Sequence, residues 1–130
     1  MKTRMLLLLT LVTFLSCAQK SEKRNFISQE AFSKFLTSDI QLLDVRTARE
    51  FQRGYIKDAI LIDFYDPYFV SKVQAAFDKK KPLYIYCSVG GRSNKASLKL
   101  VTEGFQEVYN LEGGYSKYQK NNKSFFVRDD

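Results

Sequence analysis

The sequence predicts an α/β fold with a central, mainly parallel sheet of about five strands and helices on both faces. Segments rich in strand-forming residues alternate with segments whose apolar residues recur at helical spacing. One segment, LYIYC at 83–87, is apolar throughout, as expected of a central strand that is buried on both sides. A chain of 130 residues is long enough for one hydrophobic core, so we predict a single folded domain.

The elements before this strand are predicted from capping residues and apolar spacing. Ser28 has the residue type of an N-cap for a helix over 29–37, and IQLLDV at 40–45 favours a strand. TARE at 47–50 has the pattern of a capping box, so a short helix is expected there, closed by Gly54.

The remaining elements alternate in the same way. A strand is expected over 59–63, and Asp66-Pro67 has the pattern of an N-cap followed by a first-turn proline. The helix that they would open has an apolar face made of Phe69, Val73, Ala76 and Phe77. After the glycine-containing turn that follows Cys87 we expect a helix from Ser93 to Gly104, a strand over 107–111, and a turn and terminal helix over 113–120.

The amino-terminal segment has the layout of a signal peptide. Two basic residues precede an apolar run from Met5 to Leu15, and a small residue precedes Cys17. The run is too short to span a bilayer comfortably, although an uncleaved membrane anchor is the alternative. We divide the chain into a signal peptide (1–16), a tether (17–25), a domain (26–122) and a tail (123–130).

The end of this segment, Leu15-Ser16-Cys17, resembles the lipobox of bacterial lipoproteins, with Phe14 where leucine is preferred. The resemblance implies cleavage before Cys17 and lipidation of that residue. The domain would then face the periplasm from a lipid anchor in the cell envelope. Ala18 follows the cysteine where a retention signal would have aspartate, which favours the outer membrane over the inner.

The net charge by itself excludes few classes of function. The whole chain has a formal charge of +7, and without Lys2 and Arg4 it keeps 19 basic and 14 acidic residues. These basic residues are scattered and no aromatic residues interleave them in a stripe, so a solvated surface is favoured and no nucleic-acid partner is predicted. No metal site and no cofactor are predicted either.

The stretch CSVGGRS at 87–93 carries the chemistry. If Cys17 is lipidated, Cys87 is the one thiol left in the chain. Glycines after it allow a tight turn whose backbone N–H groups point inward, and the start of the following helix and Arg92 add positive charge. These features favour a thiolate, so Cys87 is predicted to be a nucleophile rather than an inert buried thiol.

Four motifs in order resemble the single-domain rhodaneses, a sulfurtransferase family. They are LLDVRTAREFQRGYIKDAILID at 42–63, PLYIYC at 82–87, CSVGGRS at 87–93 and YNLEGGYSKY at 109–118. The resemblance spans residues 26–120 and includes the family's Cys-x-x-Gly-x-Arg-Ser loop.

The resemblance implies transfer of a sulfane sulfur through a persulfide on Cys87. A small donor such as thiosulfate would supply the sulfur, and a small thiol or a protein would accept it. The loop residues would hold the donor and the persulfide; they are Ser88, Val89, Gly90, Gly91, Arg92 and Ser93. Asp44 and Arg46 would support the loop from beneath, with Glu50 pairing to Arg46, or they form an ion pair with a purely structural role.

Three other functions remain open. A sulfur carrier or docking module of the cell envelope would use the same loop but would need a partner protein. Phosphatase or arsenate-reductase chemistry uses a similar cradle, but one residue longer than the one between Cys87 and Arg92. A redox role would need a second molecule, because no resolving cysteine accompanies Cys87.

Overall fold

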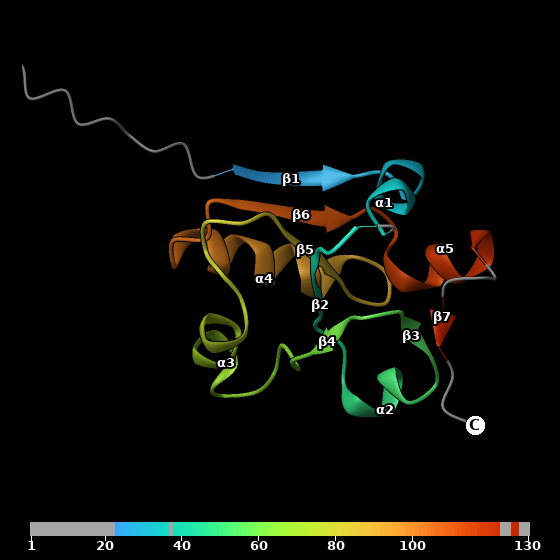
Figure 1. Ribbon diagram of the computed structural model, residues 1–130. Coiled ribbons are helices and arrows are strands. Elements are labelled where there is room, and N and C mark those ends of the chain that lie inside the picture. Colours follow the sequence, from blue (N-terminus) through green and yellow to red (C-terminus); the bar gives the residue numbers. More distant parts are fainter. Residues whose placement is uncertain (1–22, 37, 123–125, 128–130) are drawn as a thin grey trace, which may run out of the picture.

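A five-stranded parallel sheet forms the centre of the computed structural model, which describes residues 23–36, 38–122 and 126–127. The strands lie in the order β1-β6-β5-β2-β4, and every neighbouring pair is parallel (Figure 1). Their bounds are β1 (Lys23–Ile27), β2 (Gln41–Asp44), β4 (Ile60–Leu61), β5 (Leu83–Tyr86) and β6 (Glu107–Leu111). The predicted α/β class is confirmed, and β5, predicted as the central strand, is buried at all four positions.

Helices cover both faces of the sheet. On one face, α3 (Phe69–Ala76) and α4 (Gly91–Thr102) pack over a core cluster that includes Leu43, Ile85 and Val108. On the other face, α1 (Gln29–Phe35) and α5 (Gly114–Asn121) pack over a second cluster that includes Leu42 and Tyr84. Neighbouring residues of β2 therefore point to opposite faces, as strand geometry requires.

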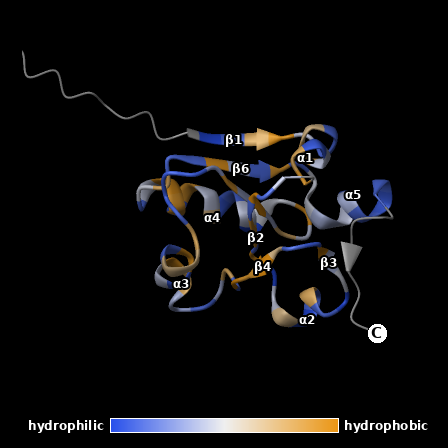
Figure 2. Ribbon diagram, in the orientation of Figure 1, coloured by the Kyte–Doolittle hydropathy of each residue, from blue (hydrophilic) through white to orange (hydrophobic). Residues whose placement is uncertain are grey.

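The helix α5 is hydrophilic by composition and still belongs to the core. Figure 2 draws it mostly in blue and white. Tyr115 and Tyr118 are nevertheless buried in it, and Tyr118 contacts the Phe32 ring edge to face, at a centroid separation of 5.8 Å. Tyrosine has a large apolar ring that a hydropathy scale understates, because the hydroxyl group dominates its value.

The first strand was not predicted. Residues 23–25 fall within the predicted tether, but they form the start of β1, which pairs with β6 from Lys23–Glu107 to Ile27–Leu111. The predicted signal peptide, Cys17 and the rest of the tether lie outside the described residues. The structure does not test these predictions. Within the described residues, no helix has the length and hydrophobicity needed to cross a bilayer.

Two further strands and one helix start also differ from the prediction. Strand β3 (Tyr55–Ile56) pairs antiparallel with β7 (Phe126–Val127), which lies in the predicted tail. Helix α3 begins at Phe69 rather than after Asp66, and its N-cap is Tyr68. The Asp66 carboxylate accepts the Tyr68 N–H at 2.8 Å, which makes a turn before the helix instead of capping it.

Candidate active site

The predicted reactive loop connects the central strand β5 to α4. Helix α4 starts at Gly91, two residues before the predicted start at Ser93. Gly90 caps it with a φ of +110°, a left-handed conformation that residues with a side chain rarely adopt. This glycine lets the chain reverse direction so that loop N–H groups point back toward Cys87.

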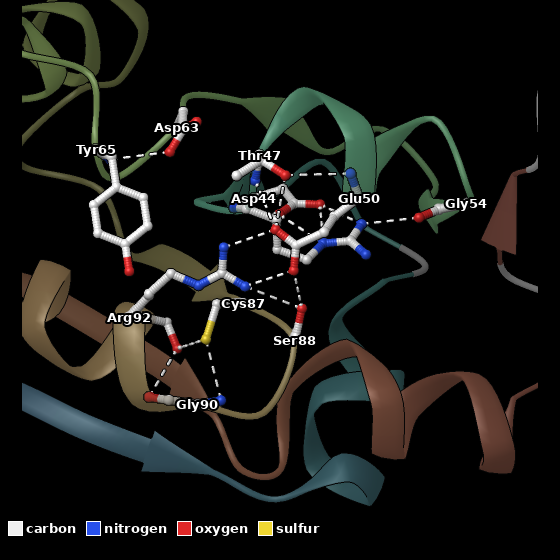
Figure 3. A network of polar contacts seen from close by, with 12 residues as sticks. Asp44, Thr47, Glu50, Gly54, Asp63, Tyr65, Cys87, Ser88, Gly90 and Arg92 are labelled. Atoms are coloured by element: carbon white, nitrogen blue, oxygen red, sulfur yellow. Dashed lines mark hydrogen bonds and ion pairs between the residues drawn. The ribbon is translucent and has the colours of Figure 1, made fainter.

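The Cys87 sulfur lies inside this turn. The Gly90 N–H donates to Sγ at 3.1 Å and the Ser93 hydroxyl lies 3.4 Å from it (Figure 3). Burial of the thiol raises its pKa, but hydrogen bonds from the Ser93 side chain and from the backbone of Ser93, Gly90 and Val89 outweigh that effect. The pKa of Cys87 is therefore lowered, as the sequence predicted for this loop.

Arg92 forms a bidentate salt bridge with Glu50. Its guanidinium donates to Oε2 at 2.7 Å and to Oε1 at 2.6 Å (Figure 3). The Ser88 hydroxyl donates to the same carboxylate at 2.5 Å and accepts from Arg92 at 3.1 Å. The hydrogen bond from Arg92 is the main cause that holds the pKa of Glu50 well below its usual range.

The predicted pairing of Glu50 with Arg46 is wrong. Arg46 pairs with Asp44 instead, at 2.6 Å, and both side chains are buried. Its guanidinium also donates to the Gly54 carbonyl at 2.8 Å and lies 4.0 Å from the centre of the Tyr115 ring. Glu50 points away because it closes the capping box of α2 (Ala48–Phe51), where its carboxylate accepts the Thr47 N–H.

The turn that opens α5 holds the reactive loop from the other side. The N–H groups of Tyr115 and Ser116 donate to the carbonyl oxygens of Cys87 and Ser88, at 2.8 and 3.0 Å. A Cβ atom on Gly114 would overlap both of these carbonyl groups, so the two backbones can approach each other only at a glycine. The glycine pair at 113–114 is visible in the sequence, but only the fold brings it against the reactive loop.

Tyr65 is a second residue near the loop that was not predicted from the sequence. It follows β4, its ring lies beside Arg92 in Figure 3, and 67% of its surface is exposed. No residue spacing marks it, because the segment after β4 reaches the loop only through the fold.

A hollow of about 270 Å³ lies beside the loop. Val89, Gly90 and Gly91 line it from the loop, and Phe26 and Asn110 line it from the ends of β1 and β6. It opens at the carboxyl edge of the sheet, where α/β proteins bind their ligands. Among the described residues, no group of three or more His, Cys, Asp or Glu side chains is placed to hold a metal ion.

Similarity to known proteins agrees with this geometry. The sequence matches the rhodanese-like domain family over residues 28–121. It is 33% identical over 93 residues to the mitochondrial protein HIGH ARSENIC CONTENT 1 of Arabidopsis thaliana, a match that covers 65% of this chain and 55% of that protein. It is 31% identical over 113 residues to the chloroplastic thiosulfate sulfurtransferase 16 of the same plant, covering 80% of this chain and 94% of that protein.

Among solved structures, a rhodanese-like domain protein from Staphylococcus aureus superposes with a TM-score of 0.70 and 27% identity. The match covers 82% of this chain and 100% of that one. The chain thus has the rhodanese fold, and it spans about half the length of the first Arabidopsis relative.

Proposed function

The chain belongs to the rhodanese-like domain family, and from this premise we propose that it is a sulfurtransferase. It would move a sulfane sulfur from a donor such as thiosulfate, through a persulfide on Cys87, to a thiophilic acceptor. A relative of nearly the same length is named a thiosulfate sulfurtransferase, which supports the reaction class.

The reaction divides into two balanced steps. In the first, the Cys87 thiolate attacks the outer sulfur of thiosulfate, a new S–S bond forms, and sulfite leaves with the electron pair of the broken S–S bond. In the second, a nucleophilic acceptor attacks the outer sulfur of the persulfide and the Cys87 thiolate is released. No external oxidant or reductant is needed.

The main support for this proposal is the set of hydrogen-bond donors around the Cys87 sulfur. The Gly90 N–H and the Ser93 hydroxyl point at Sγ and stabilise negative charge there. The same donors would stabilise the terminal anionic sulfur of a persulfide.

The loop geometry favours sulfur over phosphate as the transferred group. The Arg92 guanidinium is engaged by Glu50 through two nitrogen atoms. A phosphatase cradle would need that guanidinium for the equatorial phosphate oxygens. With only four residues between Cys87 and Arg92, the loop encloses less space than a phosphate cradle does.

We further propose that the domain acts in the bacterial cell envelope, held by lipid on Cys17. The layout of residues 1–17 supports this assignment. Expression of the full chain with labelled fatty acid tests it, because label should enter the wild type and not Cys17→Ala. Label in both proteins would contradict the assignment.

The sulfur transfer is tested by intact mass of the chain from Ala18 onward after incubation with thiosulfate, beside Cys87→Ser. A gain of one sulfur atom on the wild type alone, reversed by cyanide, is the expected result. No gain on a thiol that still reacts with an alkylating reagent would exclude thiosulfate as the donor. A sulfur relay that needs a protein partner would then be favoured.

A further inference from the structure

Arg92 carries the only formal charge of the segment 87–93, and this charge is neutralised. Two guanidinium nitrogen atoms donate to the two carboxylate oxygens of Glu50, at 2.7 and 2.6 Å. The two planar groups meet in the paired geometry that makes such ion pairs strong. An anion that approaches Cys87 therefore meets a neutral pair and not a free cation.

Glu50 is fixed in this position by contacts besides Arg92. It accepts hydrogen bonds from the Ser88 hydroxyl at 2.5 Å, from the Thr47 hydroxyl at 2.9 Å and from the Thr47 N–H at 3.0 Å. Its carboxyl pKa is lowered, chiefly by the hydrogen bond from Arg92, so it is ionised at neutral pH. The carboxylate is thus a permanent negative charge that contacts the reactive loop.

Arg46, which also lies near the strand ends, gives no compensation. Arg46 is paired with Asp44 and buried, so it adds no net charge to the site. Glu50 cancels the attraction that the Arg92 charge alone would exert on a negatively charged reactant, and that attraction grows with each negative charge of the reactant. A dianion such as thiosulfate therefore loses more attraction than a monoanion does, and a neutral molecule loses none.

We propose that Glu50 determines the charge of the reactants that Cys87 accepts, and that it favours a sulfur donor with at most one negative charge. Organic persulfides and thiosulfonates are donors of this class. With a thiosulfonate the Cys87 thiolate attacks the terminal sulfur, an S–S bond forms, and a sulfinate leaves with the electron pair of the broken S–S bond. The identity of the donor rests on the proposed sulfur transfer, but the charge effect at Cys87 does not.

The test compares two alkylating reagents of similar size, iodoacetate with one negative charge and iodoacetamide with none. The full chain is studied in detergent and the rate is read at the Cys87 peptide by mass spectrometry. Both reagents react with the same Cys87 thiolate. The fraction of Cys87 that is ionised therefore cancels in the ratio of the two rates at one pH. Glu50→Gln keeps an amide oxygen for the capping box and removes the charge.

Glu50→Gln is expected to raise the iodoacetate-to-iodoacetamide ratio about fivefold, as expected when one nearby charge is removed at the effective dielectric of a protein surface. Glu30→Gln is the matched control, since it removes the same charge from an exposed pair with Lys34 on α1. This control should leave the ratio unchanged, and a ratio unchanged in Glu50→Gln would overturn the proposal.

A second arm applies the idea to donors. In Glu50→Gln the KM for thiosulfate should fall by a larger factor than the KM for methanethiosulfonate, a monoanion in which the same kind of S–S bond breaks. An equal change in both would overturn the assignment of donor charge. If neither donor loads sulfur on the wild type while the alkylation ratio still rises, the proposed sulfur transfer fails and the charge effect of Glu50 stands.

Discussion

The backbone N–H of Tyr115 donates a hydrogen bond of 2.8 Å to the carbonyl oxygen of Cys87. A residue at the start of the last helix thereby fixes the peptide group of the nucleophile. The neighbouring bond from Ser116 to the Ser88 carbonyl repeats the contact one residue later. With both carbonyl groups held outward, the following N–H groups of the loop are left to point toward the sulfur.

Gly114→Ala should break this contact. The position has a φ of +58°, and a Cβ there would overlap the Cys87 and Ser88 carbonyl groups, which are backbone and cannot rotate away. We expect a loss of about 2–4 kcal/mol in the free energy of unfolding, measured by chemical denaturation. Gly91→Ala is the control for stability, because nothing lies within 4 Å of its Cβ position and its φ is not positive. Equal stability of the two variants would contradict this account of the turn.

The buried pair of Asp44 and Arg46 should be a stability element. Arg46→Met leaves the Asp44 carboxylate buried without its partner, so we expect a loss of about 3–5 kcal/mol in the free energy of unfolding. The double variant Asp44→Leu/Arg46→Met should lose less than Arg46→Met alone, because it leaves no uncompensated charge. A double variant less stable than the single one would show that the pair contributes more than its burial costs.

Local signals in the sequence were enough to predict four of the five strands of the sheet and the reactive loop. The fully apolar run at 83–87 identifies the central strand without knowledge of its neighbours, since only a strand covered on both faces needs no polar side. The capping box of α2 and the cysteine before two glycines are equally local patterns, and the structure contains both.

The remaining elements depend on contacts that no local pattern records. Strand β1 is a polar edge strand, and it forms because its backbone pairs with β6, more than eighty residues away. Likewise the spacing of Arg46 and Glu50 suggests a helical ion pair, but α2 begins only at Ala48. Arg46 therefore precedes the helix and turns inward to Asp44, while Glu50 reaches Arg92 across the loop.

The Glu50–Arg92 pair should couple the two residues energetically. Arg92→Ala leaves Glu50 partly buried without its guanidinium, so it should cost more stability than Arg92→Ala does in a Glu50→Gln background. We expect a coupling free energy of about 1–2 kcal/mol in a double-mutant cycle at neutral pH. A coupling free energy near zero would mean that water replaces either partner of the ion pair without loss of stability.

Stability should depend on acid through the same carboxylate. Folding lowers the pKa of Glu50, so its ionised form stabilises the fold at pH values above the unfolded pKa of about 4.3. That stabilisation should be lost as the pH falls from there through the lower folded pKa. The difference in free energy of unfolding between wild type and Glu50→Gln should therefore be largest at neutral pH and shrink in acid. A difference that stays constant from neutral to strongly acidic pH would show that ionisation of Glu50 is not its source.

Ser93 should set the pH at which Cys87 becomes reactive. Its side chain provides the largest of the hydrogen-bonding effects that lower the pKa of the Cys87 thiol, against the effect of burial, which raises it. Ser93→Ala should therefore raise the pKa and move the pH profile of iodoacetamide alkylation to higher pH, with a severalfold slower reaction at neutral pH.

Two features of that profile separate an effect on the thiol pKa from a change in the shape of the loop. At high pH both proteins hold Cys87 as thiolate, so the rates of wild type and Ser93→Ala should converge; a deficit that persists there would mean that the loop has moved. Ser97→Ala is the matched control, because this hydroxyl is buried one turn further along α4 and donates to the Ser93 carbonyl at 2.7 Å. It should leave the profile in place, since the Ser97 hydroxyl donates to the Ser93 carbonyl and not to the sulfur.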